Sequence, residues 1–326
     1  VLQDITLNGY DENLRFDSFE TVLKKFTADI GEQVKTIFEN SVLSLFCDSS
    51  FHFKEFDPCT VVSLFEQSCV EKGLSYKEGG TVYTVVSPHI GGVPDAVNSL
   101  YAIKKAVYDD KLVTFEGFMK ILKNNWDGEE TLRRRILNGY MYFGNDNDEA
   151  DEIAVRVLSG FSDSCMEYDK RTPVRFVSGV STFGRQLEWA GTRLAAPFGR
   201  KSGEVLSGNM SPTPGTDISG ATAIIKSYCK ADLKKQYTGA ALDISFVQSN
   251  MEGENALTAI IGLIKGFVRL GGCFMQIDTV SADILREAQK NPENFKSLTV
   301  RVSGWNARFV TMNKEWQDMI IKRQSR

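Results

Sequence analysis

The chain of 326 residues carries a net charge of −4 and 42% hydrophobic residues, which is enough apolar material for one large or two modest domains. Its basic clusters are short and no run of about 18 apolar residues is present, so the sequence indicates neither a nucleic-acid surface nor a membrane span. Six scattered cysteines and only two histidines, His52 and His89, argue against a zinc site, a disulfide scaffold and a serine triad; we expect a cytoplasmic protein without a metal.

Apolar spacing predicts a mainly helical first half. Asp57-Pro58 begins one of these helices and Gly73 ends it, while Asp95 is the expected N-cap of the next. Between them, β-branched and aromatic residues predict a buried strand at 81–86, followed by a loop at 87–94. The predicted helices cover residues 18–47, 60–72, 95–110, 115–125, 129–140 and 147–168.

The second half is predicted to alternate strands and helices. A strand at 174–180 leads into a segment at 184–220 that is rich in Gly, Pro, Ser and Thr, which we interpret as a long, ordered and functional loop. Strands at 241–247, 273–280 and 298–303 then alternate with helices at 255–270 and 282–290. This order predicts an α/β layer or barrel.

Two further motifs suggest ligands, but their spacing does not support a site. The segment Gly199-Arg200-Lys201-Ser202-Gly203 lacks the spacing of a phosphate-binding loop. The carboxylates that follow residue 145 lack the glycine and terminal glutamate of a calcium loop, and the N-terminus of a helix explains them better. They are Asp146, Asp148, Glu149, Asp151 and Glu152.

Near the C-terminus, the segment Arg301-Val302-Ser303-Gly304-Trp305-Asn306-Ala307-Arg308-Phe309 places a lone glycine before large aromatics. Glycine has no Cβ, and loss of one Cα hydrogen would leave a radical delocalised over the adjoining amides, which persists only when shielded from solvent. Trp305 and Phe309 supply bulk for a shield, and Arg301 and Arg308 could fix the loop through charge-assisted hydrogen bonds. An ordinary glycine in a strand-to-helix turn is the alternative interpretation.

The pattern Arg301-Val302-x-Gly304-aromatic-x-x-x-Phe309 resembles the radical loop of the glycyl radical enzymes, which include pyruvate formate-lyase and related diol dehydratases and decarboxylases. The resemblance covers nearly the whole chain, because further segments resemble the C-terminal half of those enzymes in the same order. These segments are 79–83, 95–105, 143–146, 198–204, 211–212 and 291–294.

This resemblance implies an α/β fold in which two five-stranded halves form a ten-stranded barrel wrapped by helices. The chain resembles the second half, with residues 1–200 as the C-terminal part of the barrel domain and 201–326 as the glycine radical domain. In the family, a radical at the position of Gly304 takes a hydrogen atom from a cysteine thiol, and the thiyl radical then attacks the substrate.

The cysteine of that relay lies on a loop upstream of every segment matched here, so we expect this chain to lack it and to begin mid-helix beyond it. Cys69-Val70-Glu71 resembles the family's Cys-Val-Glu sequence but falls inside the helix predicted at 60–72. We therefore interpret Cys69 as a small buried residue.

The resemblance also implies that two strand ends face the substrate cavity. Ser87 and His89 follow one strand, and Val180, Ser181 and Thr182 end another. His89 could hydrogen-bond a substrate oxygen or relay a proton, since its ordinary pKa is near neutrality. A purely structural role is the alternative for each residue.

The implied activity is that of an oxygen-sensitive lyase that breaks a C–C, C–O, C–N or C–S bond of a small anaerobic metabolite. A radical S-adenosylmethionine activase would create the radical at Gly304, no cofactor would be bound permanently, and the complete enzyme would be a homodimer. Trp305-Asn306 and Ser87-Pro88-His89 resemble the dehydratases and decarboxylases more than formate C-acetyltransferase, which is the second hypothesis. A non-catalytic radical-domain subunit and a gene fragment are the remaining alternatives.

Overall fold

The computed structural model describes residues 2–4, 7, 16–55, 60–182, 184–246, 253–302 and 306–324. The main helices are α1 (Phe19–Ile37), α2 (Thr60–Leu64), α3 (Gln67–Lys72), α4 (Val93–Ile103), α5 (Phe115–Lys123), α6 (Glu130–Gly139), α7 (Asp148–Asp169), α8 (Gln186–Ala190), α9 (Ala221–Lys230), α10 (Gly253–Arg269), α11 (Ala282–Lys290) and α12 (Lys314–Gln324). The strands are β1 (Val85–Val86), β2 (His89–Ile90), β3 (Arg175–Phe176), β4 (Gly179–Val180), β5 (Ala241–Ser245), β6 (Phe274–Asp278), β7 (Thr299–Arg301) and β8 (Asn306–Arg308).

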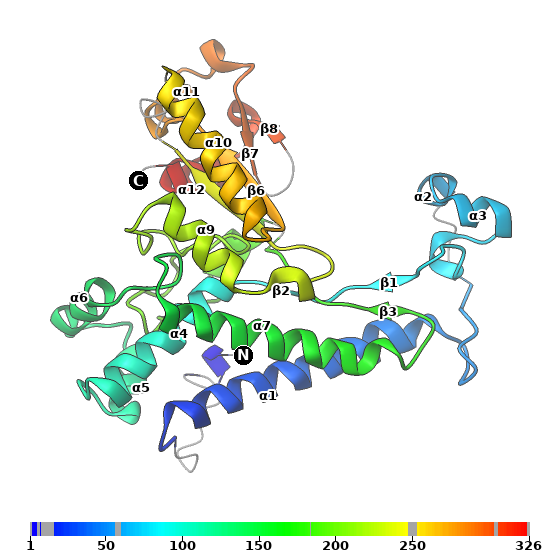
Figure 1. Ribbon diagram of the computed structural model, residues 1–326, viewed down its shortest axis with the longest axis horizontal. Helices are drawn as coiled ribbons and strands as arrows, with labels where there is room; N and C mark the ends of the chain where they lie inside the picture. Colours follow the sequence, from blue (N-terminus) through cyan, green and yellow to red (C-terminus); the bar gives the residue numbers. More distant parts are fainter. Residues whose placement is uncertain are drawn as a thin grey trace.

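Two long helices, α1 and α7, lie side by side and form the base of the main core (Figure 1). Ser18 begins α1, because its hydroxyl accepts a hydrogen bond from the Thr21 N–H at 3.3 Å. The buried residues of α1, from Phe19 to Val34, are all apolar and recur mostly at intervals of three or four positions. The helical periodicity of the sequence thus accounts for the buried face of α1, which packs beside α7.

The strands run in a parallel series. β1 pairs with β3, β2 pairs with β4, and an isolated parallel bridge joins Val180 of β4 to Ala240, directly before β5. β5 pairs with β6 over five residues, and α10 is the crossover helix between them. Among the described residues these strands form small two-stranded sheets in a helix-rich α/β fold, and the implied ten-stranded barrel is not shown.

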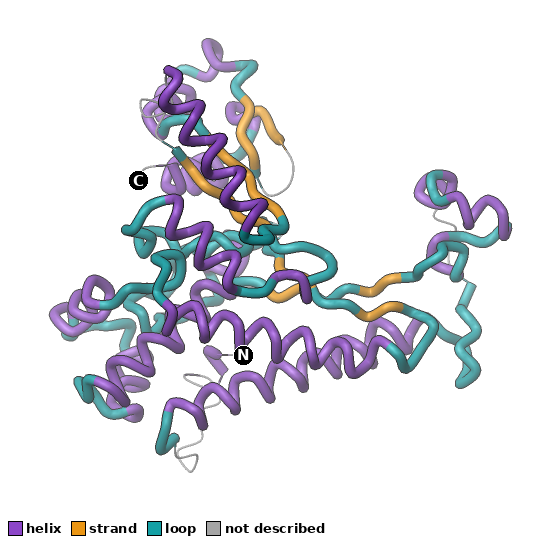
Figure 2. The backbone as a smooth tube through the Cα atoms, in the orientation of Figure 1, coloured by secondary structure: helices purple, strands orange, loops and turns teal. Residues whose placement is uncertain are grey.

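The described residues from 282 onward, 282–302 and 306–324, form a unit with a core of its own. β7 and β8 make an antiparallel hairpin, and α11 and α12 pack beside it (Figure 2). Phe309 and Ile320 are fully buried in this second core, together with Leu285. The hairpin that carries the predicted radical loop is therefore anchored by apolar packing on one side.

Several sequence predictions need correction. The buried strand expected at 81–86 is wrong, because only Val85–Val86 is a strand and Val82 and Tyr83 are 72% and 68% exposed. This segment belongs to an arm that carries α2 and α3 away from the main body (Figure 1). The helix expected at 60–72 is interrupted between α2 and α3; Asp57 and Pro58 lie outside the described residues.

Asp95 is not a helix cap. Gly92 precedes α4 with φ +70°, and Asp95 is buried in the first turn, where the N–H and hydroxyl of Ser207 donate to its Oδ2. Burial raises the pKa of Asp95 above its ordinary value, against the hydrogen bonds from Ser207. The carboxylate thus ties α4 to the loop at 184–220.

The strand expected at 174–180 is divided into β3 and β4, and the loop expected at 87–94 contains β2. α9, α12 and β8 were not predicted from the sequence. Within the described residues, no helix is both long and apolar enough to cross a bilayer.

Candidate functional site

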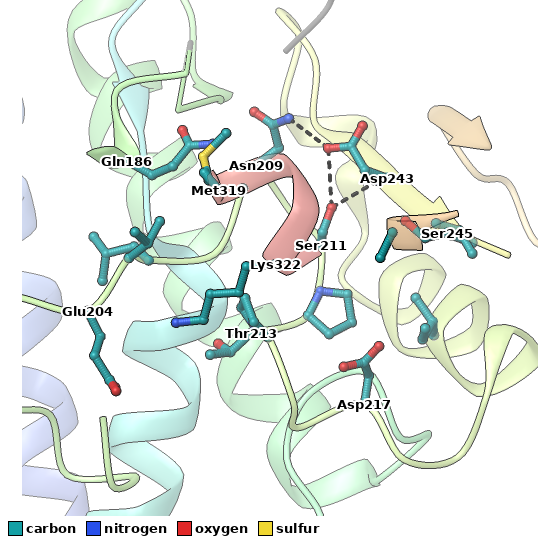
Figure 3. A pocket seen from close by; sticks show the side chains of 18 of the residues that line it. Gln186, Glu204, Asn209, Ser211, Thr213, Asp217, Asp243, Ser245, Met319 and Lys322 are labelled. Atoms are coloured by element: carbon teal, nitrogen blue, oxygen red, sulfur yellow. Dashed lines mark hydrogen bonds between the residues drawn. The ribbon is translucent and has the colours of Figure 1, made fainter. Parts of the chain in front are cut away.

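A cavity of about 810 Å³ separates the C-terminal unit from the parallel strands (Figure 3). Asn209 and Asp243 line it from the strand side, and Val302 and Lys322 line it from the C-terminal unit. Polar groups and charges of both signs face a space large enough for a small metabolite. Val302 places this space two residues from Gly304 along the chain.

A hydrogen-bonded network forms one wall of the cavity. The N–H and hydroxyl of Thr182 lie 3.1 and 3.3 Å from Asn209 Oδ1, and Asn209 Nδ2 donates to Asp243 Oδ2 at 3.2 Å. The Asp243 N–H donates to Ser211 Oγ at 2.9 Å, and that hydroxyl lies 3.4 Å from Asp243 Oδ2 (Figure 3). Asn209 has φ +49°, a left-handed conformation that asparagine tolerates better than most residues. Thr182 is therefore connected to the cavity wall through Asn209.

Ser87 and His89 belong to a second cluster, which is centred on Thr238. Thr238 Oγ1 lies 2.5 Å from Ser87 Oγ and 3.2 Å from His89 Nε2, and it donates to Ser178 O at 3.2 Å. Burial lowers the pKa of the His89 imidazole below its ordinary value, which favours the neutral ring. Gly179 makes the cluster possible, because a Cβ there would come within 2.2 Å of Thr238 Oγ1.

The five residues predicted to line the substrate pocket thus lie in different parts of the structure. Ser87 and His89 share the Thr238 cluster, Thr182 supports the cavity wall, and Val180 is buried in the main core. Ser181 is half-buried, and its N–H donates to Ile90 O at 3.3 Å. None of them is among the described residues that line the cavity directly. The sequence analysis missed Thr238, Asn209 and Asp243, since isolated polar residues in loops and strands carry no spacing signal.

The radical-loop residues lie on or beside the β7–β8 hairpin, whose tip, Ser303, Gly304 and Trp305, lies outside the described residues. Phe309 is fully buried, and its N–H donates to Leu298 O at 2.9 Å. Arg301 is half-buried, whereas Arg308 is exposed. The supporting roles predicted for Trp305, Arg301 and Arg308 therefore stay predictions.

Two motifs that the sequence analysis set aside contain buried side chains in the structure. Cys69 is 3% exposed on α3. The Arg200 guanidinium is buried and donates to the carbonyls of Leu194 and Glu204.

The carboxylate cluster surrounds the start of α7, as predicted, and Lys230 lies within it. Lys230 Nζ is 2.6 Å from both Asp146 and Asp148 and 3.1 Å from the buried Asp151. A single lysine ammonium, held by three carboxylates, therefore offsets part of the negative charge of this cluster.

Comparison with known proteins agrees with this architecture. A family model described as pyruvate formate lyase-like matches residues 6–189, and one described as glycine radical matches residues 206–310. The chain is 28% identical to trans-4-hydroxy-L-proline dehydratase of Clostridioides difficile and 27% identical to the 4-hydroxyphenylacetate decarboxylase glycyl radical subunit of the same species, over 98% and 99% of its own length.

Among solved structures, a glycerol-bound, B12-independent glycerol dehydratase from Clostridium butyricum superimposes with a TM-score of 0.87 and 30% identity. That alignment covers 98% of this chain but 42% of the dehydratase, and the chain spans 41% and 39% of the two curated relatives. Since the pyruvate formate lyase-like match alone covers more than half of its residues, the chain belongs to the pyruvate formate-lyase-like family of glycyl radical enzymes.

Proposed function

We propose that the chain is the C-terminal portion of a glycyl radical lyase and that Gly304 stores the radical. The observation that carries this proposal is the glycine radical match over residues 206–310, which includes Gly304. The β7–β8 hairpin supports it, because the two strands bring Arg301 and Asn306 into register on either side of the glycine. Burial of Val302 and Phe309 anchors the loop from both ends.

In this proposal, residues 1–200 are part of the barrel domain and residues 201–326 form the glycine radical domain. The parallel series from β2 to β6 supports a half-barrel, which an amino-terminal half would complete to ten strands. That half would supply the cysteine loop, because Cys69 is buried in a helix. A radical S-adenosylmethionine activase would remove the hydrogen atom from Gly304, and the complete enzyme would form a homodimer.

We propose that a small metabolite binds beside this loop. Ser87, His89, Val180, Ser181 and Thr182 are the pocket residues that we propose for this chain. A neutral His89 beside Thr238 can exchange a proton with a substrate oxygen, and Thr182 can orient the cavity wall through Asn209. Arg301, Trp305, Arg308 and Phe309 are proposed to hold the radical loop.

The relatives favour elimination or decarboxylation over acetyl transfer, since their names describe dehydratases and a decarboxylase. Formate C-acetyltransferase activity is therefore the second candidate. A non-catalytic radical-domain subunit or a gene fragment remains an alternative, because the chain spans 41% of the length of the hydroxyproline dehydratase.

Electron paramagnetic resonance after anaerobic activation tests the proposal. We expect a doublet in the wild type, no signal in Gly304→Ala, and the wild-type signal in Gly262→Ala. Gly262 is a matched control because a Cβ there meets nothing within 4 Å. On exposure to air, the activated wild type should break between Ser303 and Gly304; an intact mass, or a doublet in Gly304→Ala, would contradict the proposal.

A further inference from the structure

Lys322 brings a positive charge into the cavity between the C-terminal unit and the parallel strands. Its side chain extends from α12 into this space (Figure 3). It forms no hydrogen bond or ion pair with any residue that the structure describes. Two other cations that line the cavity are paired: Arg133 lies 2.8 Å from Glu130. Arg286 lies 2.7 Å from Asp283. The Lys322 ammonium is therefore available to an anionic ligand.

Gln186 adds a buried acceptor to the same cavity. Its side chain lines the space and is 6% exposed, and its Oε1 has no hydrogen-bond partner among the described residues. Its Nε2 faces Met319 Sδ at 3.7 Å, and a thioether is only a weak acceptor. Because buried polar atoms in native proteins are almost always hydrogen-bonded, a donor on a bound ligand would complete this amide.

α12 brings these two groups to one wall of the cavity. Met319, which contacts Gln186, and Lys322 are three residues apart on α12, so they lie on the same face of the helix. The Cβ atoms of such neighbours are about 5–6 Å apart. One small molecule can therefore contact the Lys322 ammonium and the Gln186 amide together. Val205 and Val280, which line the same cavity, suit its aliphatic carbons.

We infer that Lys322 and Gln186 form a subsite for a small hydroxy acid. The ligand carboxylate accepts hydrogen bonds from the Lys322 ammonium, and the ligand hydroxyl donates to Gln186 Oε1. This inference rests on the proposed function, because it names the class of metabolite that the cavity beside the radical loop takes. The two contacts together favour a hydroxy acid over a simple acid, which lacks the hydroxyl, and over a diol, which lacks the charge.

Isothermal titration calorimetry of this chain with three probes that share one carbon skeleton tests the inference. Lactate carries both groups, propionate lacks the hydroxyl, and 1,2-propanediol lacks the charge. We expect lactate to bind about tenfold more tightly than 1,2-propanediol, equivalent to about 1.4 kcal/mol, and about threefold more tightly than propionate. Added salt should weaken the binding of lactate and leave the binding of 1,2-propanediol unchanged.

Variants assign the two contacts separately. Lys322→Met removes the charge, so lactate should lose its advantage over 1,2-propanediol, whereas Lys322→Arg should retain it. Gln186→Leu should remove the advantage of lactate over propionate. Lys290→Met is the matched control, because Lys290 is exposed on α11 of the same unit and is not among the described residues that line the cavity. This control should bind lactate like the wild type.

Three outcomes would overturn the inference: equal binding of lactate and 1,2-propanediol, an unchanged preference for lactate in Lys322→Met, or an equal loss of that preference in Lys290→Met. Inorganic phosphate that binds more tightly than lactate would also overturn it, since the subsite would then take a phosphate ester. Lactate binding as expected in a wild type that gives no doublet after anaerobic activation would refute the proposed function alone. A doublet without any preference for lactate would refute this inference alone.

Discussion

Substitution of Gly179 by alanine tests whether the Ser87–His89–Thr238 cluster is built on a close backbone approach. An added Cβ would lie 2.2 Å from Thr238 Oγ1 and 2.8 Å from His89 Cε1. Ordinary contact begins near 3.4 Å, so the Thr238 hydroxyl would have to withdraw by about 1 Å. That movement would break its hydrogen bond to Ser178 O and its contact with Ser87 Oγ.

The expected destabilisation follows from these two effects. Overpacking of a filled site costs about 1–3 kcal/mol, and loss of a hydrogen bond costs about 1 kcal/mol more. We therefore expect Gly179→Ala to lower the free energy of unfolding by about 2–4 kcal/mol. Urea denaturation followed by intrinsic tryptophan fluorescence, to which Trp126 of the main core contributes, measures this change.

Two control variants make the test specific. Gly262→Ala adds the same methyl group inside α10 where nothing lies within 4 Å, and we expect it to stabilise the protein by up to about 1 kcal/mol. In a Thr238→Ala background, Gly179→Ala should cost at least about 1 kcal/mol less, because the closest clash is gone. Equal costs in both backgrounds, or a Gly179→Ala variant as stable as the wild type, would refute the reasoning.

Two further predictions concern buried carboxylates. Asp169 is buried and receives hydrogen bonds from Arg175 Nε at 2.9 Å and from the Phe176 N–H at 2.6 Å; burial opposes ionisation, but these bonds hold the pKa of Asp169 below its ordinary value. A depressed pKa stabilises the fold at any pH above the pKa of the unfolded chain, which is about 3.9. Asp169→Asn should therefore lower the free energy of unfolding by about 1–3 kcal/mol at pH 7. Urea denaturation at decreasing pH should show this difference shrinking below about pH 4; a pH-independent difference contradicts the prediction. Lys230→Met leaves the buried Asp151 without its cation and should lower the free energy of unfolding by about 3 kcal/mol. The control Lys226→Met removes an ion pair to the partly exposed Asp146 and should lower it by at most about 1 kcal/mol in the same assay. Equal losses would show that burial of Asp151 does not matter.

The long helices were predictable because their stability is encoded locally. α7 begins at Asp148 after the cap Asn147, with carboxylates in its first turn, close to the residues expected from the sequence. α10, α11 and the β5–β6 pair also appear where periodicity placed them. For these elements the repeat of apolar residues along the sequence matches the observed helix or strand, so a local pattern is sufficient to predict them.

The short strands could not be predicted in the same way. β1 to β4 contain two residues each, and their pairing joins positions about 90 residues apart, such as His89 with Gly179. No period-two pattern exists in two residues. Residues 81–86 have the composition of a buried strand, but the chain carries Val82 and Tyr83 on an exposed arm, which shows that composition does not determine burial.

The candidate site shows the same difference between residues with a local sequence signal and residues that meet only in the fold. Gly304 is recognisable because its neighbours form a contiguous motif, whereas Asn209, Asp243 and Thr238 meet their partners only after folding. Asn209 lies 27 residues from Thr182 and 34 from Asp243, and Thr238 lies 149 from His89. Hydrogen bonds over such distances carry no sequence spacing, so the wall of the cavity had to come from the structure.

The volume of the cavity places a requirement on the proposed chemistry. A space of about 810 Å³ beside Val302 is large enough to hold many water molecules. A carbon radical two residues away persists only if most of that water is excluded. A substrate bound inside the cavity is a surface that could exclude it. We therefore expect the proposed Gly304 radical to decay more slowly when a substrate fills the cavity than when the cavity is empty; the amplitude of the electron paramagnetic resonance doublet over time measures this, and equal decay rates would contradict it.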